Sequence, residues 1–266
     1  MREILREVAR GVTALVWPAQ CAGCGEVVDE GAAFCAECVL GLDEVGVGCA
    51  RCGEPAERAL SSCARCAAAP PAFAGAVALG RYGGPLGEAV LRLKHGRRLE
   101  VAGALAPLLA ELVLTRPELA ACEVVVPVPL APGRLARRGF DQAGELARAL
   151  VRVLRRDHRR PLLVLAALAR VRETPPQAGG PAERAANVRG AFALREAVAR
   201  ARGGSAGGGS GAGGGSGGSG VAGRAVLLLD DVMTTGATAS ACARVLRRAG
   251  ARVVYALTVA RAVASV

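Results

Sequence analysis

The chain has 266 residues, which is enough for one α/β domain and a smaller module, and a formal net charge of +11. Aromatic residues make up only 3%, so a dedicated platform that stacks nucleic-acid bases on aromatic rings is disfavoured. No apolar stretch reaches the roughly 20 residues needed to span a bilayer, and the acidic start does not fit a secretory signal. We therefore expect a cytoplasmic protein with no integral membrane segment.

Residues 1–17 carry apolar side chains at helical spacing, including Ile4, Leu5 and Val8. They predict a short amphipathic helix that packs on the body of the protein, with contact to a membrane surface as the alternative. Acidic side chains outnumber basic ones in residues 1–70, so the positive charge belongs to residues 71–266. We expect these two segments to be separate domains. The charge of the larger one suits a polyphosphate substrate and equally a nucleic-acid backbone.

Eight cysteines form two copies of one unit, the second following the first after 28 residues. Each unit holds two Cys-x2-Cys pairs, a spacing that lets tight turns direct four sulfurs at one Zn²⁺. Four thiolates leave no open coordination position, so we expect structural zinc, one or two ions, with the exchange of ligands between units left open. A disulfide framework is the alternative, which a reducing cytosol disfavours. The expected ligands are Cys21, Cys24, Cys35, Cys38, Cys49, Cys52, Cys63 and Cys66.

The segment after the cysteines predicts a strand over residues 73–82 and helices over residues 85–93 and 99–114. Lys94, the only lysine among 34 basic residues, lies in a basic stretch between the two helices. A single lysine in a chain that otherwise uses arginine indicates a place where a compact ammonium is needed. A solvated basic turn is the alternative.

The next predicted strand covers residues 123–128 and leads into a stretch rich in proline, glycine and arginine. Prolines and glycines give such a stretch the shape of a defined loop, and arginines donate hydrogen bonds to phosphate oxygens. A helix is expected from Asp141 to about Arg156, with Asp141 as its N-cap. The candidate anion ligands in the loop are Arg134, Arg137 and Arg138.

A low-complexity stretch of glycine, serine and alanine covers residues 203–220. Its composition is that of a flexible coil, and we interpret it as an insertion in a surface connection of the larger domain. A domain boundary at this place is the alternative. It is disfavoured because residues 226–259 are too few to fold separately.

The most informative segment follows this stretch. Val226–Leu229 is apolar throughout, as in a parallel strand that is covered on both faces. Asp230 and Asp231 follow at its carboxyl edge, where open α/β sheets bind ligands. Residues 234–238 then offer hydroxyls and backbone N–H groups at the start of a helix that ends near Arg248, and this arrangement favours an anion.

Residues 226–238 closely resemble the 5-phosphoribosyl-1-pyrophosphate (PRPP) motif of type I phosphoribosyltransferases. The resemblance implies an α/β fold of that type, a parallel sheet flanked by helices, joined here to a small N-terminal zinc-ribbon module. It also implies that the two acids bind the ribose hydroxyls as the catalytic pair, that the loop holds the 5′-phosphate, and that Mg²⁺ accompanies PRPP. The implied ligand-binding residues are Asp230, Asp231, Thr234, Thr235, Gly236, Ala237 and Thr238.

Two further stretches narrow the resemblance to the ComF family of competence-associated proteins, which join a cysteine-rich zinc module to a phosphoribosyltransferase domain. Residues 126–142 match the family pattern, except that Ala131 replaces a histidine and Asp141 an asparagine. Residues 174–192 match a second pattern, which forms a mobile hood over the substrate in transferases of this fold. By this resemblance the arginine loop meets pyrophosphate. The other candidate site residues are Lys94, Gln177, Arg184 and Asn187.

The resemblance implies two functions. One is a phosphoribosyltransferase associated with DNA uptake, in which a nitrogen nucleophile displaces pyrophosphate from ribose C1. The other is a non-catalytic competence factor that senses a nucleotide-like ligand and contacts single-stranded DNA or a helicase-like partner. The departures at Ala131 and Asp141 bear on turnover more than on PRPP binding. The acceptor substrate cannot be read from the sequence.

Overall fold

The computed structural model describes residues 18–95, 98–173, 181–195 and 220–263. The helix expected at residues 1–17 and nearly all of the glycine-rich stretch lie outside these residues. Within them, no helix combines the length and the apolar character that crossing a bilayer requires.

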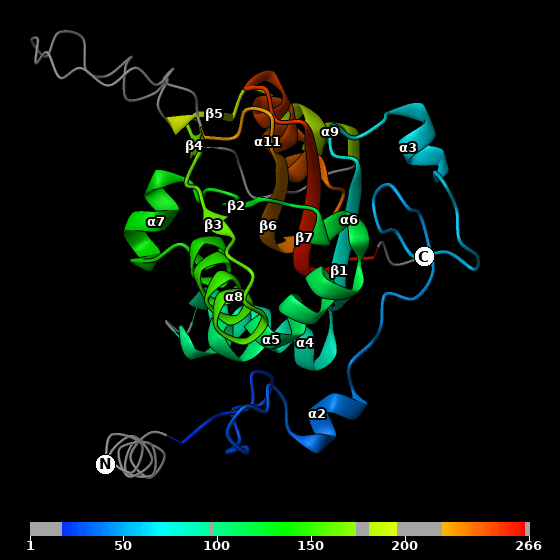
Figure 1. The fold of residues 1–266 in the computed structure, drawn as a ribbon. Helices are drawn as coiled ribbons and strands as arrows, with labels where there is room; N and C mark the ends of the chain where they lie inside the picture. The colour runs from blue at the N-terminus through cyan, green and yellow to red at the C-terminus, as the bar shows by residue number, and fades with distance from the viewer. Residues whose placement is uncertain (1–17, 96–97, 174–180, 196–219, 264–266) are drawn as a thin grey trace, which may run out of the picture.

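A five-stranded sheet forms the centre of the molecule, with the strand order β1-β7-β6-β2-β3 (Figure 1). All neighbouring strands in it run parallel, which confirms the predicted α/β sheet. The strands with the most continuous apolar sequence, β6 and β7, lie in the middle, where both faces are covered. The five strands are β1 (Gly75–Arg81), β2 (Val124–Pro127), β3 (Leu163–Val164), β6 (Ala225–Met233) and β7 (Val253–Arg261).

Helices cover both faces of this sheet, as expected. α4 (Gly84–His95), α5 (Glu100–Thr115) and α8 (Gln142–His158) pack on one face, and α11 (Ala237–Arg248) packs on the other. These four helices lie where the apolar periodicity places them. The shorter elements are α6 (Pro117–Ala120), α7 (Pro132–Arg138), α9 (Pro181–Asn187) and the antiparallel strands β4 (Leu168–Arg170) and β5 (Phe192–Leu194).

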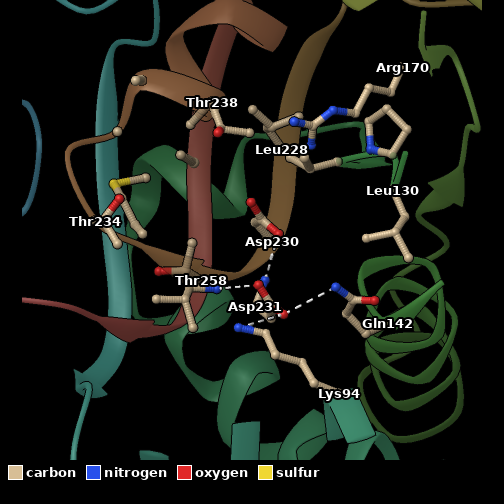
Figure 2. A pocket seen from close by; sticks show the side chains of 18 of the residues that line it. Lys94, Leu130, Gln142, Arg170, Leu228, Asp230, Asp231, Thr234, Thr238 and Thr258 are labelled. Carbon is tan, nitrogen blue, oxygen red and sulfur yellow. Dashed lines mark hydrogen bonds and ion pairs between the residues drawn. The ribbon is translucent and has the colours of Figure 1, made fainter. Parts of the chain in front are cut away.

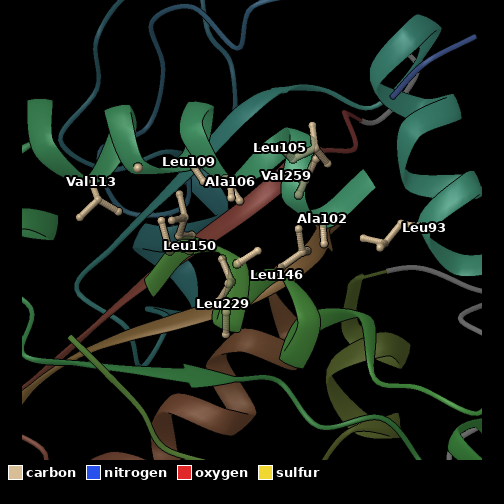
Figure 3. Close-up of a cluster of buried hydrophobic side chains, with 14 of the residues drawn as sticks. Leu93, Ala102, Leu105, Ala106, Leu109, Val113, Leu146, Leu150, Leu229 and Val259 are labelled. Carbon is tan, nitrogen blue, oxygen red and sulfur yellow. The ribbon is translucent and has the colours of Figure 1, made fainter. Parts of the chain in front are cut away.

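The hydrophobic core is divided by the sheet into two layers, because alternate residues of a strand point to opposite faces. Leu227 and Leu229 of β6 belong to the layer with α5 and α8, whereas Val226 and Leu228 belong to the layer with α11. Figure 3 shows the first layer, in which leucines of the two helices meet the sheet. The side chains labelled there include Leu105, Leu109, Leu146, Leu150, Leu229 and Val259.

The two cysteine units have the same local structure but pack on opposite faces of the sheet. A short helix follows the third cysteine of each, α2 (Ala36–Leu40) in the first and α3 (Ala64–Ala68) in the second. The first unit contributes to the α5–α8 layer, and the second contributes to the α11 layer. The chain between them passes β1, where the backbone N–H of Arg81 donates to the carbonyl of Asp43 at 2.8 Å.

Two expectations about the site segments need correction. β6 does not end before the acid pair but continues to Met233, because β7 extends beside it and pairs Asp230 with Thr258 and Met233 with Arg261. The arginine stretch is not a loop throughout. It contains α7, which has Pro132 in its first turn and Gly139, with a φ of 80°, as its C-cap residue.

Candidate functional site

A cavity of about 260 Å³ opens at the carboxyl ends of β2 and β6, between the start of α11 and the helices α4 and α8 (Figure 2). Its position is the one that open parallel sheets use for ligands. Most of the predicted site residues meet here, together with several that the sequence did not single out. Its polar and loop lining comprises Lys94, Arg134, Arg138, Gln142, Arg170, Asp230, Asp231, Thr234, Gly236, Ala237, Thr238 and Thr258.

The acid pair is asymmetric. Asp231 is 5% exposed, and its Oδ2 accepts a hydrogen bond from Nε2 of Gln142 at 3.3 Å and lies 3.4 Å from Nζ of Lys94. Its Oδ1 accepts from the backbone N–H of Val232 at 2.7 Å. Asp230 also lines the cavity, and its Oδ1 accepts from the N–H of Asp231 at 2.9 Å (Figure 2). One cation, Lys94, and two hydrogen-bond donors thus hold Asp231, whereas Asp230 faces the cavity.

Burial raises the pKa of the Asp230 carboxyl well above its ordinary value. The charge of Asp231 raises this pKa further, against the opposing effects of the Asp231 N–H group and the Lys94 ammonium. Burial also raises the pKa of Asp141, the N-cap residue of α8. A cation or a hydrogen-bond donor bound in the cavity would therefore be stabilised by Asp230, whose charged form has little other compensation there.

We expect Asp230→Asn to stabilise the unliganded protein at neutral pH. The pKa of this acid is 3.8 in the unfolded state and higher in the folded state. As pH rises from the first value through the second, the unfolded state loses its proton more readily, so the free energy of unfolding falls. The variant has no carboxyl at position 230, so its free energy of unfolding does not fall in this way. Its melting temperature should exceed that of the wild type at pH 7 and approach it below about pH 4. Thermal unfolding followed by circular dichroism across this pH range measures the difference. A constant difference at all pH values would contradict the assignment.

Residues 234–238, here called the threonine loop, lead from the end of β6 into the first turn of α11. Gly236 has a φ of 77°, a left-handed conformation that favours glycine, and it is the N-cap residue of α11. The N–H of Ala237 points to Thr235 Oγ1 at 3.4 Å. Thr234 and Thr238 line the cavity, and the helix start directs N–H groups toward it, which suits an anion. Thr235 lies apart from the other members, because it lines a different cavity behind the loop.

The predicted arginines extend the site on the side of α7. A second cavity of about 380 Å³ shares Lys94, Arg134 and Arg138 with the first one and adds Arg137. These four residues, here called the basic wall, line the two adjoining cavities and suit an extended polyphosphate. Ala131, the N-cap residue of α7, is buried and lines neither cavity.

Three polar side chains that line the cavity were not predicted as site residues. Arg170 comes from β4, where its guanidinium lies 5.3 Å from the ring centroid of Phe192 on β5. Burial and the charge of Arg134 lower the pKa of Arg170. Gln142 is the last residue of the stretch 126–142 that matches the family pattern, and this position could have marked it as a site residue. Thr258 lies between apolar residues in β7, and this pattern was also an available signal.

The candidates of the second matched stretch do not reach the cavity in this structure. Arg184 and Asn187 belong to α9, and neither lines the cavities described above. The backbone carbonyl of Asn187 instead accepts a hydrogen bond from Arg172 at 2.8 Å. Gln177 lies outside the described residues.

The eight predicted ligands form two separate clusters, one in each unit, so the units do not exchange ligands. In each cluster all four sulfurs lie within 4.8 Å of one another. Sulfur–sulfur distances of 3.7 Å for Cys24–Cys35 and 3.8 Å for Cys52–Cys63 fit a tetrahedron with Zn–S bonds of about 2.3 Å, whose edges are about 3.8 Å. Cys21 and Cys49 each accept a backbone N–H from the third cysteine of their unit, at 3.3 and 3.2 Å. The chemistry and geometry fit two structural zinc ions.

Fold and site together define a double-zinc-ribbon protein with a parallel α/β domain. At the carboxyl edge of its sheet lies a cavity that is lined by basic side chains and by two aspartates. Residues 12–67 match the family model of the double zinc ribbon domain. The DNA utilization protein YhgH of Escherichia coli O6:H1 is 31% identical over 191 residues, 70% of this chain and 71% of the relative. The protein of that name from Salmonella typhimurium is also 31% identical, over 189 residues with the same coverage. The chain belongs to the ComF family, which includes these relatives.

Proposed function

We propose that the cavity binds PRPP or a related phosphoribosyl ligand, in a cytoplasmic protein that serves DNA uptake and utilization. The observation that carries this proposal is the meeting of the acid pair, the threonine loop and the basic wall in one cavity. The threonine loop would hold the 5′-phosphate, Asp230 and Asp231 the ribose hydroxyls, and Arg134, Arg137 and Arg138 the pyrophosphate. The name of the relatives, DNA utilization protein, supports the assignment to DNA utilization.

Mg²⁺ is the cation that this ligand would bring. The residues present fit it, because Asp230 supplies a hard oxygen ligand that lines the cavity, and the Asp231 N–H group and Lys94 offset the burial of its charge only in part. When bound, the ion would neutralise pyrophosphate charge. Lys94 and Gln142 would hold Asp231 in place, and the arginines would receive the leaving group. The contribution of the protein is thus positioning and electrostatic stabilisation.

In domain terms, we propose that residues 71–266, with the insertion at 203–220, form the ligand-binding domain. Residues 1–70 then form the zinc module that supports it. This division accords with the match of the double zinc ribbon model to residues 12–67.

The second candidate function is nucleotide sensing and single-stranded-DNA binding without turnover. It is favoured by a groove of about 630 Å³ on the outer face of α8, lined by four arginines and two valines. A row of arginines along a helix suits a phosphate backbone. The four arginines are Arg148, Arg152, Arg155 and Arg156.

We expect PRPP with Mg²⁺ to raise the melting temperature of the wild type, because a ligand that binds only the folded state stabilises it. Absence of a shift at millimolar PRPP would contradict the proposed ligand. Release of pyrophosphate with a purine, a pyrimidine or a small amine would identify a transferase. Salt-dependent binding of single-stranded DNA that is lost when the α8 arginines are changed to glutamine, without pyrophosphate release, would identify the second function.

A further inference from the structure

The two zinc ribbons are alike in spacing but not in their surroundings. Cys24 of the first ribbon is exposed, whereas Cys52, its counterpart 28 residues later, is only 2% exposed. Equal ligand sets therefore sit in different environments, and the second is part of the layer of the core that contains α11. The threonine loop leads into the same helix.

A chain of polar contacts leads from the second zinc centre to the end of β6. Nη2 of Arg65 donates to Sγ of Cys52 at 3.4 Å and to Oε2 of Glu54 at 2.9 Å. Glu54 also forms an ion pair with Arg261, which is 1% exposed and is the last residue of β7. Arg261 pairs in register with Met233, the last residue of β6, which directly precedes the threonine loop. The position of β7 at this end is therefore tied to the metal centre.

A second route is apolar and runs behind the loop. Phe73 packs with the cysteines of the second ribbon, and a Cβ placed on Gly236 would lie 3.4 Å from Cζ of that ring. The N–H of Ala72 donates to Oγ of Ser240 at 3.0 Å, and the N–H of Ser240 donates to the carbonyl of Gly236 at 2.8 Å. Both contacts fix the rear of the threonine loop against the chain that leaves the second ribbon.

A cavity of about 340 Å³ is lined both by the second zinc centre and by the threonine loop, so the two lie on either side of one small space. Cys52, Cys66 and Arg65 line it from the ribbon, and Thr235 and Gly236 line it from the loop. Thr235, which points away from the ligand cavity, thus belongs to the surface that faces the zinc centre.

Among the residues that the structure describes, the first ribbon has no equivalent chain of polar contacts to the end of β6. The residues 28 positions before Glu54 and Arg65 are Glu26 and Glu37, and neither forms an ion pair within the described part of the chain. Arg92 of α4 instead donates a hydrogen bond of 3.5 Å to the carbonyl of Gly23 in this ribbon. That helix lies on the other face of the sheet from α11.

We propose that the second zinc ribbon positions the threonine loop, with Glu54 and Arg65 as the positioning residues, and that the first ribbon does not. Occupancy of the centre formed by Cys49, Cys52, Cys63 and Cys66 sets how firmly the loop is held, and through the loop it sets the affinity for a phosphorylated ligand. The second part of this inference rests on the proposed function. The first part concerns the loop alone and is tested without ligand.

The test compares Glu54→Gln with Glu26→Gln, its counterpart in the first ribbon, in full-length protein loaded with zinc. Hydrogen exchange of the peptide that contains residues 234–238, measured without ligand, should become roughly tenfold faster in Glu54→Gln and stay unchanged in Glu26→Gln. Glu54→Asp should restore part of the protection. Equal exchange in Glu54→Gln and wild type, with two zinc ions in each, would overturn the proposal.

A spectroscopic measurement on the wild-type sequence avoids any variant that fails to fold. Coupling between two sites is reciprocal, so PRPP should perturb the second metal centre. With ¹¹³Cd in place of zinc, we expect PRPP to shift the resonance of the second centre and not that of the first, with Cys24→Ser as the assignment variant. Binding of PRPP with neither resonance shifted would overturn the coupling. Failure of PRPP to bind would contradict the proposed function and leave the exchange result to decide the role of Glu54.

Discussion

Asparagine at both 230 and 231 is expected to abolish the stabilisation by PRPP while the fold is retained. The change removes both carboxylates that line the cavity, and with them the acceptors proposed for the ribose hydroxyls and the ligand proposed for Mg²⁺. At 100 times the dissociation constant a ligand stabilises the folded state by about 2.7 kcal/mol, or roughly 5–10 °C for a chain of this size. The variant should show no shift under the same conditions. Differential scanning fluorimetry with PRPP and Mg²⁺ measures this directly.

Asp157→Asn is the matched control, because this acid on α8 pairs with Arg156 at the surface. It should respond to PRPP as the wild type does. The single variants are also informative, since Lys94 and Gln142 hold Asp231 and not Asp230. A double variant that still gained the full shift would exclude the acid pair from the ligand site.

Serine at Cys66 is expected to lower the zinc content from two ions to one and to unfold the second ribbon. Cys66 is buried in the four-thiolate cluster, and structural zinc contributes about 10–16 kcal/mol to the folding of such segments. The layer of the core that contains Phe73 and α11 includes this ribbon, so the loss should spread to the whole chain as a large fall in the denaturation midpoint. Metal analysis and denaturant unfolding measure the two effects.

Cys122→Ala provides the control for this experiment. Cys122 is equally buried but belongs to neither cluster, so both zinc ions should remain bound. Cys24→Ser should also remove one ion, with a smaller loss of stability, because Cys24 is exposed. Retention of two ions in Cys66→Ser would contradict the assignment of the second centre.

The features that could be predicted from the sequence are those that depend on neighbouring residues. Buried parallel strands are continuous apolar runs, so Val226–Leu229 was recognised without any knowledge of its partners. Cysteines with two residues between them share one turn, and for that reason all eight metal ligands were predicted. Lys94 was identified only because the chain has no other lysine.

The features that escaped prediction depend on residues that are distant in the sequence. The continuation of β6 to Met233 requires β7 beside it, and β7 follows only after α11. Arg170 reaches the cavity because β4 pairs with β5, 22 residues further along the chain. The choice between shared and separate zinc clusters also required the packing of each unit on its own face of the sheet.

The chain between the two ribbons has a further consequence, for the free edge of the sheet. β1 is an outermost strand, and an uncovered edge of this length is a template for pairing with another molecule. Hydrogen bonds from the backbone N–H and from Nε of Arg81 to the carbonyls of Asp43 and Glu44 place the inter-ribbon chain against it. The opposite edge is β3, which has only two residues. The ribbons therefore hold the inter-ribbon chain over the edge strand β1, and this cover protects the protein from aggregation. A chelator that unfolds the ribbons would expose β1 to pairing with another molecule.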